Sequence, residues 1–201
     1  MKDRNAIYFV DIDDTLFKTF ANIHVLEAGV PTRKLTNNEF NSYQLQKDEE
    51  FDFHEFKDSE LFKDTSTPID QVQCIIKHIH TKVKQQPNSR IILLTARADF
   101  YDKEPFLQTF RDHDIDIDNM YVERVGNMPG SGSARKKKIV VRSYINNGKY
   151  NKVKMVDDHK GNLDSFLELQ NEFSDIEFKA WHINKAGKST LVNSGDLYSI
   201  Y

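Results

Sequence analysis

The stretch AIYFVDIDDTLF, residues 6–17, decides the fold class of this chain. Its first five residues are apolar and rich in β-formers, a pattern that predicts a fully buried strand. The strand is followed at once by Asp11, Asp13, Asp14 and Thr15. Crowded carboxylates repel one another, so they need a cation nearby to offset the repulsion. The stretch therefore predicts a buried strand with a cation-binding site at its carboxyl end.

Apolar runs and helical patterns alternate along the rest of the chain. Helices are predicted from a Thr67-Pro68 start through residue 83, at 102–112, at 134–147 and around 163–169. Strands are predicted at 91–94, 120–125, 153–156 and 176–183. Short strands that are apolar throughout and alternate with helices are typical of a parallel sheet covered on both faces. We expect an α/β protein with a Rossmann-like, doubly wound parallel sheet.

Residues 18–66 break this alternation. The segment is rich in aromatic residues and has an acidic stretch at 48–64, and it is too aromatic for a disordered linker. We expect a small cap or lid insertion after the first strand, over the strand ends. Residues 1–17 and 67–201 would then form the core.

Bulk composition narrows the class of protein. The 201 residues are 38% hydrophobic and 29% charged, with a formal net charge of −3. The lone cysteine, Cys74, excludes an internal disulfide, fits a reducing compartment and is predicted to be a buried structural thiol. Nothing resembles a signal peptide, and no apolar run reaches the roughly 20 residues of a membrane span. We expect a cytoplasmic protein with no membrane partner and no obligate protein partner.

Three polar residues that come just past predicted strand ends converge on one edge of such a sheet. They are Asp11, Thr95 and Asp157, and ligands of parallel α/β sheets bind at that edge. Paired carboxylates can share Mg²⁺, which prefers hard oxygen ligands. A threonine hydroxyl and backbone N–H can hold a phosphoryl oxygen, and a lysine at a helix N-terminus adds positive charge. Together these groups suit phosphoryl transfer.

The order of these motifs also carries a family resemblance. DIDDT (11–15), LLTAR (93–97), a lysine near 138 and VDDHKGN (156–162) resemble the haloacid dehalogenase (HAD) superfamily of phosphohydrolases. The resemblance implies that Asp11 is the nucleophile that forms an aspartyl-phosphate. It implies that Asp13 is general acid and then general base, that Thr15 orients Asp13, and that the Asp13 backbone carbonyl joins the Mg²⁺ sphere.

The full set of site residues follows from the motifs and the resemblance. The catalytic residues are Asp11, Asp13 and Lys138; the phosphate-binding residues are Thr15, Thr95, Ala96 and Arg97; and the Mg²⁺ ligands are Asp11, Asp13, Asp157 and Asp158. Among the candidate lysines, Lys138 is favoured over Lys137 and Lys136. Its spacing to Asp157 matches that in the 3′-phosphatase domain of polynucleotide kinase-phosphatases, and it shares a helix face with Arg142 and Ile145.

Several of these assignments have an alternative. Arg97 reaches a substrate phosphate or forms an ion pair with Asp99 or Asp102. Asp158 binds the metal through water or supports Lys138. Asp14 is expected to be structural, at a position where many family members have glycine. Neighbouring histidines are not expected to act in the site: His159 starts a helix, and His78 and His80 lie on different helix faces.

The substrate prediction comes from charge and from resemblance. Residues 133–154 contain eight basic residues and no acidic one, which favours additional phosphates near the site. The strand FKAWHI (178–183) and the small insertion also look like the 3′-phosphatase domain. We expect a nucleotide or polynucleotide 3′-phosphate rather than a sugar phosphate or phosphoprotein, although the net charge and the acidic stretch oppose a long nucleic acid.

Other classes stay open beside this one. A HAD phosphatase for another small phosphometabolite or for a phosphoprotein is the main alternative, with the basic stretch as a merely solvated helix face. A catalytically inactive nucleic-acid-binding module is less favoured, because it would have lost Asp11 or Asp13. A signalling receiver domain also uses aspartates, a threonine and a lysine, but its motifs come in a different order.

Overall fold

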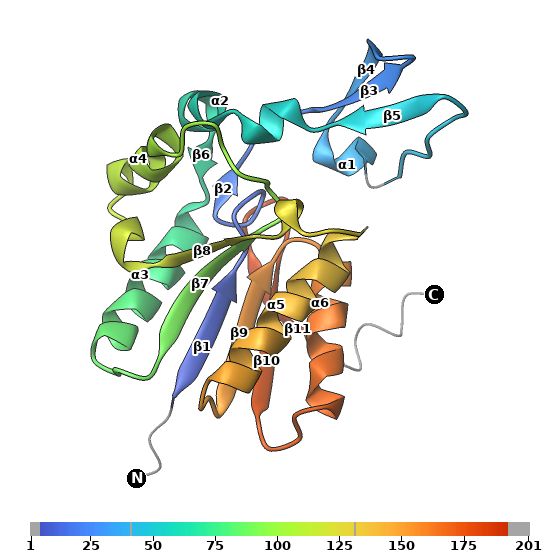
Figure 1. Ribbon diagram of the computed structural model, residues 1–201. Coiled ribbons are helices and arrows are strands. Elements are labelled where there is room, and N and C mark those ends of the chain that lie inside the picture. The colour runs from blue at the N-terminus through green and yellow to red at the C-terminus, as the bar shows by residue number, and fades with distance from the viewer. Residues whose placement is uncertain (1–4, 41, 131, 193–201) are drawn as a thin grey trace.

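A six-stranded sheet forms the centre of the computed structural model, which describes residues 5–40, 42–130 and 132–192 (Figure 1). Its strand order is β11-β10-β9-β1-β7-β8, and every neighbouring pair is parallel except β10 and β11. The strands are β1 (Ala6–Val10), β7 (Arg90–Thr95), β8 (Tyr121–Arg124), β9 (Lys152–Asp157), β10 (Glu177–Ile183) and β11 (Ser189–Val192). The predicted α/β class with a parallel sheet is confirmed, and the antiparallel edge strand β11 was not predicted.

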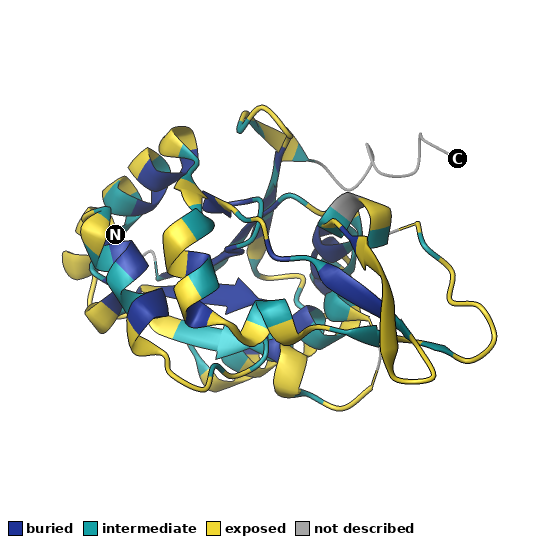
Figure 2. Ribbon diagram, turned by 90° about the horizontal axis from the view of Figure 1, so that it is seen from above, coloured by how far each residue is buried: buried dark blue, intermediate teal, exposed yellow. Residues whose placement is uncertain are grey.

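Helices cover both faces of this sheet. Helices α5 (Ser133–Asn147) and α6 (Lys160–Leu167) pack on one face, where Ile92 and Leu94 of β7 are buried. Helices α3 (Asp70–Lys84) and α4 (Glu104–Asp112) pack on the other, where Ile91 and Leu93 are buried. Side chains of a strand alternate between faces, and residues 91–94 of β7, which are covered on both sides, are accordingly apolar at every position. Figure 2 shows the resulting pattern, with buried residues inside and exposed residues on the outer helix faces.

Strand register brings the predicted site residues to one edge. Val10 of β1 lies opposite Leu93 of β7 and Val156 of β9. Asp11 and Asp157 therefore leave their strands side by side, and the Asp11 N–H donates to the Val156 carbonyl at 2.9 Å. Thr95 ends the neighbouring strand on the other side. The parallel register alone thus places these three residues together.

The segment between β1 and α3 lies over the carboxyl ends of the strands (Figure 1). It contains a three-stranded antiparallel sheet in the order β4-β3-β5 with its own small core of Ile23, Val25 and Leu35. Its elements are β2 (Phe17–Lys18), β3 (Ile23–Glu27), β4 (Val30–Leu35), α1 (Asn37–Phe40), β5 (Glu49–Asp52), the 3₁₀ helix η1 (His54–Lys57), α2 (Ser59–Thr65) and β6 (Thr67–Pro68). The remaining 3₁₀ helices are η2 (Ile117–Asn119), η3 (Val125–Asn127) and η4 (Glu168–Asn171).

Helix α2 joins this insertion to the core. The Phe62 side chain is 2% exposed and its ring lies 5.7 Å from that of Phe17 and 5.0 Å from that of Phe106. The two ends of the segment pair as antiparallel strands β2 and β6, with Phe17 opposite Pro68. The insertion is therefore anchored both at its ends and through α2.

Two local predictions are wrong. Thr67-Pro68 does not start a helix, because it pairs with β2 as strand β6 and α3 begins at Asp70. Cys74 is exposed rather than buried. The inward face of α3 is formed by Val72 and Ile76, four residues apart, and Cys74 lies midway between them on the outer side. Among the described residues, no helix has the length and apolar character needed to cross a membrane.

The packing of α2 on the core predicts a large cost for truncating its buried ring. Phe62→Ala should lower the free energy of unfolding by about 3–5 kcal/mol, because the loss of a buried aromatic side chain leaves a cavity. Urea denaturation followed by circular dichroism measures this change. Tyr101→Ala is the matched control, since Tyr101 is 97% exposed, and it should change stability by no more than about 0.5 kcal/mol. Equal effects of the two substitutions would contradict the packing.

Candidate active site

The centre of the site is a lysine buried between two carboxylates. The Lys137 Nζ lies 2.7 Å from Asp11 Oδ1 and 2.8 Å from Asp157 Oδ2. Lys137 is 1% exposed, Asp11 5% and Asp157 0%. The three residues come from α5 and from the ends of β1 and β9. One ammonium thus joins a helix to two central strands.

This lysine is Lys137 and not Lys138, which corrects the sequence prediction. Lys138 points outward and forms an ion pair with Glu168 at 2.6 Å. The buried residues of α5 are Lys137, Val141 and Ile145, four residues apart in turn. That spacing keeps Lys137 on the inward face, whereas Lys138 and Arg142 share the outer face. The spacing to Asp157, taken from the resemblance, was off by one residue.

Asp157 is further held by the loop that follows it. Its Oδ1 accepts hydrogen bonds from the His159 N–H at 2.9 Å and from Asn162 Nδ2 at 2.8 Å. His159 immediately precedes α6, as expected for a helix-start residue. The contribution of Asn162 was missed, although the residue lies in the quoted VDDHKGN motif on the first turn of the helix.

Thr15 contacts Asp11 and Asp158. The resemblance had implied that Thr15 orients Asp13, and this prediction is wrong. Its Oγ1 lies 3.3 Å from Asp11 Oδ2 and 3.3 Å from Asp158 Oδ1, and it accepts the Asp158 N–H at 2.9 Å. Asp158 therefore lies beside Thr15, which removes the alternative that it supports Lys138. The threonine links the loop after β1 to the loop after β9.

Asp13 is instead held by the loop after β7. Arg97 donates to both Asp13 oxygens, from Nε at 3.0 Å and from Nη2 at 2.7 Å. The Thr95 hydroxyl donates to Asp13 Oδ2 at 3.2 Å and accepts the Arg97 N–H at 3.1 Å. Arg97 thus forms its ion pair with Asp13, and neither Asp99 nor Asp102 is its partner. Asp99 pairs with Arg124 at 2.6 Å.

The insertion encloses Arg97, which is 2% exposed. Its guanidinium carbon lies 4.7 Å from the ring centre of Phe62 and 5.0 Å from that of Phe56. Its Nη1 donates to the Phe56 carbonyl at 3.1 Å. This arginine is buried, stacked and bonded to Asp13 and to the Phe56 carbonyl, so it would have to leave these contacts to reach a phosphate. Its neighbour Ala96 is exposed.

Asp14 has a structural role in the loop after β1. Its backbone has φ of +56°, a conformation that glycine adopts freely and that aspartate tolerates better than most residues. Its carboxylate accepts from Asn37 Nδ2 at 2.9 Å and from the Thr19 N–H at 3.5 Å. Asp14 thereby ties the loop after β1 to the insertion, and the backbone explains why glycine also suits this position.

Comparison with solved structures identifies the fold. The HAD domain of the effector protein Lem4 from Legionella pneumophila is 15% identical, with a TM-score of 0.53, and the match covers 97% of this chain and 92% of that one. The chain has the HAD fold. A structure of the Pnkp1/Rnl/Hen1 RNA repair complex matches at 16% identity and TM-score 0.52, and a structure of the Pnkp1/Rnl/Hen1 complex at 18% and 0.50.

The two RNA-repair matches are partial. Each covers 92% of this chain but only 44% or 47% of the other, so this chain spans less than half the length of those proteins. No protein-family model matches the sequence. No curated protein matches it either. The family resemblance of the sequence motifs is therefore confirmed at the level of the HAD fold.

The acidic end of this HAD fold fits a divalent cation. Oxygens of Asp11, Asp157 and Asp158 lie within 4.8 Å of one another. One lysine ammonium faces these three carboxylates, which leaves an excess of negative charge. A donor set made of carboxylate oxygens suits Mg²⁺, Ca²⁺ or Mn²⁺. The Asp13 carboxylate lies outside this set, because Arg97 holds it.

Burial and nearby charges shift the pKa values of these carboxyl groups. Burial raises the pKa of Asp158 from 3.8 to about 7, and the nearby carboxylates of Asp157 and Asp14 add to the shift. Burial also raises the pKa of Asp11, and Lys137 only partly opposes the effect. Burial acts on Asp13 in the same direction, but the Arg97 guanidinium outweighs it and lowers the pKa of that carboxyl. Asp13 is thus ionised while Asp158 is poised to take up a proton.

The raised pKa of Asp158 predicts a pH dependence of stability. Between about pH 4 and pH 7 the folded state binds a proton that the unfolded state has lost, so stability falls as pH rises through this window. In EDTA, the melting temperature of Asp158→Asn should rise relative to that of the wild type as the pH increases from about 4.5 to about 7. Excess Mg²⁺ should reduce the gain. A constant difference between the two proteins would contradict the shift.

Proposed function

We propose that the protein is a Mg²⁺-dependent phosphomonoesterase that acts through an aspartyl-phosphate on Asp11. The observation that carries the proposal is the buried Lys137, which holds the Asp11 carboxylate at the sheet edge. A second carboxylate, Asp13, is fixed nearby by a separate pair of residues, Arg97 and Thr95. Two carboxylates with different supports suit a nucleophile and an acid–base group.

The proposed reaction has two displacements at phosphorus. In the first, an Asp11 oxygen forms a bond to phosphorus while the ester bond breaks, and Asp13 gives its proton to the leaving oxygen. In the second, Asp13 removes a proton from water, which attacks phosphorus and releases phosphate from Asp11. Bound Mg²⁺ would neutralise negative charge on the carboxylates and the phosphoryl oxygens. Splitting one hard step into two easier ones is the general advantage of covalent catalysis.

Lys137 and the loop after β7 have supporting parts in this mechanism. Lys137 keeps Asp11 and Asp157 in place and adds positive charge beside the phosphate. Ala96 is exposed, and its backbone N–H is the group we assign to binding a phosphoryl oxygen. The Thr95 hydroxyl is buried and bonded to Asp13, so it would have to leave that contact to bind a second phosphoryl oxygen. Arg97 sets the position of Asp13 and lowers its pKa. A phosphate dianion brings negative charge close to Asp13, which raises that pKa and lets Asp13 carry the proton it must donate.

The favoured substrate is a nucleotide or a polynucleotide 3′-phosphate end. The RNA repair complexes that share the fold support this class. Exposed rings on the insertion support it as well: Phe20 is 51% and Phe53 40% exposed, and such rings can stack on bases. A HAD phosphatase for another small phosphometabolite or a phosphoprotein is the alternative.

The basic stretch 133–154 supports this substrate less than its sequence indicates. Lys137 lies inside the site, and Lys138, Arg142 and Lys152 are paired with Glu168, Glu172 and Glu177. The Lys154 ammonium lies 4.8 Å from the Tyr8 ring centre. Much of the positive charge is therefore neutralised or packed on the protein itself.

The nucleophile is tested by Asp11→Asn. The amide cannot attack phosphorus, so hydrolysis of p-nitrophenyl phosphate with Mg²⁺ should fall to the assay background while the circular dichroism spectrum stays unchanged. Asp13→Asn should lower turnover by about 10²- to 10⁴-fold, the usual contribution of proton transfer. Asp14→Asn, in the same loop, is the control and should keep most of the activity. Substantial turnover by Asp11→Asn would rule out the covalent mechanism.

The lysine assignment is tested by adjacent substitutions. Lys137→Met should lower kcat by at least about 10²-fold, because it removes a charge aimed at the reacting group. Lys138→Met should leave kcat near the wild-type value, since its ammonium only pairs with Glu168 at the surface. Steady-state kinetics of both folded variants makes the comparison. A greater loss for Lys138→Met would reverse the assignment.

The substrate class is tested by a panel of phosphomonoesters. A 3′-phosphorylated oligonucleotide or a mononucleotide should give a higher kcat/KM than sugar phosphates or a phosphopeptide. Phe20→Ala should lower kcat/KM for the oligonucleotide and leave that for p-nitrophenyl phosphate unchanged, because only a base can stack on the ring. If a sugar phosphate or the phosphopeptide has a kcat/KM that is higher by about tenfold, or roughly 1.4 kcal/mol, the nucleic-acid substrate is ruled out. The phosphatase proposal itself would still stand.

A further inference from the structure

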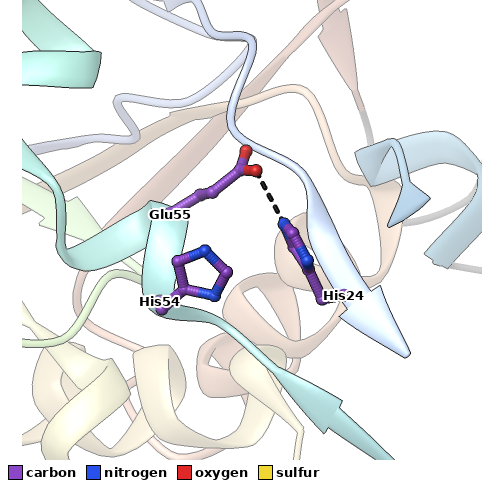
Figure 3. Close-up of side chains that lie close together, drawn as sticks. All are labelled: His24, His54 and Glu55. Carbon is purple, nitrogen blue, oxygen red and sulfur yellow. Dashed lines mark hydrogen bonds and ion pairs between the residues drawn. The ribbon is translucent and has the colours of Figure 1, made fainter. Parts of the chain in front are cut away.

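A second cluster of potential ligands lies in the insertion, away from the carboxylates of the sheet edge. His24 comes from β3, and His54 and Glu55 come from η1 (Figure 3). Donor atoms of the three side chains lie within 4.8 Å of one another. His24 Nε2 is 2.7 Å from Glu55 Oε1, and the two imidazole ring centres are 4.3 Å apart. Two imidazoles and a carboxylate thus converge from two separate elements.

Neighbouring groups hold each of these side chains in a ligand-like orientation. Asp52 Oδ2 lies 2.5 Å from His54 Nδ1. When Nδ1–H donates to this carboxylate, the lone pair of the ring is on Nε2, as in many metal-binding histidines. The Asn22 N–H and Nδ2 donate to Glu55 Oε2 at 2.7 and 3.1 Å, which leaves Oε1 facing the histidines. His24 is 7% exposed and has little freedom to turn away.

An ordinary ion-pair network accounts for only part of this arrangement. Glu55 pairs with His24 and with Lys34, whose Nζ lies 3.2 Å from Oε1. The second imidazole, His54, pairs with Asp52, and neither ion pair requires the two imidazoles to lie side by side. The Lys34 side chain is 63% exposed, so a metal ion can displace its ammonium into solvent. The arrangement is what a metal site requires and more than an ion pair requires.

We propose that His24, His54 and Glu55 bind one Zn²⁺ ion, with Asp52 as the group that orients His54. Two imidazole nitrogens and one carboxylate oxygen are donors that suit Zn²⁺, whereas Mg²⁺ prefers oxygen alone. The site is therefore chemically distinct from the carboxylate cluster at the sheet edge. Three protein ligands leave a coordination position for water or for a donor atom of a bound molecule.

Such an ion would join β3 to η1 next to the active site. Glu55 precedes Phe56, whose carbonyl accepts from Arg97 Nη1 at 3.1 Å, and Arg97 in turn holds Asp13. The ion would thus stabilise the part of the insertion that encloses Arg97. The proposal does not depend on the phosphatase function, because it concerns binding by residues outside the proposed catalytic set.

Isothermal titration of Zn²⁺ into chelator-treated protein tests the site. The Asp11→Asn background is used, because it weakens competing binding at the sheet edge. One tight site is expected. His54→Ala should weaken it by at least about tenfold, and Asp52→Asn by about tenfold or more, the usual loss when an orienting partner is removed. His54 is 56% exposed in its side chain, so its substitution should leave the fold intact. His78→Ala, at an exposed position on α3, is the matched control and should bind as the parent does.

Nuclear magnetic resonance of the histidine rings gives an independent readout. Zn²⁺ should shift the ring signals of His24 and His54 and leave those of His78 in place. Unchanged affinity in His54→Ala, the absence of Zn²⁺ binding by the parent, or ring shifts that miss His24 and His54 would each overturn the proposal. Binding lost in His54→Ala and kept in His78→Ala, with both rings shifted, would establish it.

Discussion

The ammonium of Lys137, buried between the carboxylates of Asp11 and Asp157, is the interaction on which the rest of the site depends. It links α5 to the ends of β1 and β9 and sets the position of the proposed nucleophile. Such a contact is costly to break, since loss of one partner of a buried pair costs about 3–5 kcal/mol. It also leaves an excess of negative charge among Asp11, Asp157 and Asp158, which fits a divalent cation. Burial raises the pKa of Asp158, and the neighbouring carboxylates add to that shift.

The insertion fixes the position of a second carboxylate, Asp13, by enclosing Arg97. Arg97 is far from Phe56 and Phe62 in sequence, yet their rings enclose its guanidinium and direct it to Asp13. The two carboxylates of the DIDDT motif therefore have separate supports, one from α5 and one from the loop after β7. The separation shifts the two pKa values in opposite directions, upward for Asp11 and downward for Asp13. The proposed roles therefore require that a bound cation lowers the first and a bound phosphate raises the second. The zinc site that we propose lies on the insertion side of this arrangement.

Sequence reasoning predicted the parts of the fold that depend on local patterns. β1 and residues 91–94 of β7 are apolar at every position because both faces are covered, and this made the two strands recognisable. β9 has lysines at 152 and 154 and was recognised from Val153, Met155 and Val156. Parallel strands end at one edge, so Asp11, Thr95 and Asp157 could be placed together without a structure. The choice between Lys137 and Lys138 could also have been made from α5 alone, because Val141 and Ile145 continue the inward face that begins at Lys137.

Contacts between distant segments were not predictable in the same way. β4 is exposed at every position except Leu35, so it has no alternating pattern to reveal a strand. The partner of Arg97 depends on how the insertion folds back over the core. The sequence prediction considered Asp99 and Asp102, which are near in the chain, and missed Asp13. Thr15 was assigned to Asp13 through the resemblance, whereas the register of β1 and β9 brings it to Asp158.

The most direct test of the central claim is to trap the proposed covalent intermediate on Asp11. The protein is mixed with a phosphomonoester and Mg²⁺, quenched in acid and reduced with borohydride, which converts an aspartyl-phosphate to homoserine. Peptide mass spectrometry then locates the modified residue. The account predicts homoserine at position 11, dependent on substrate and absent from Asp11→Asn. Turnover without modification at position 11, or with homoserine at another aspartate, would contradict it.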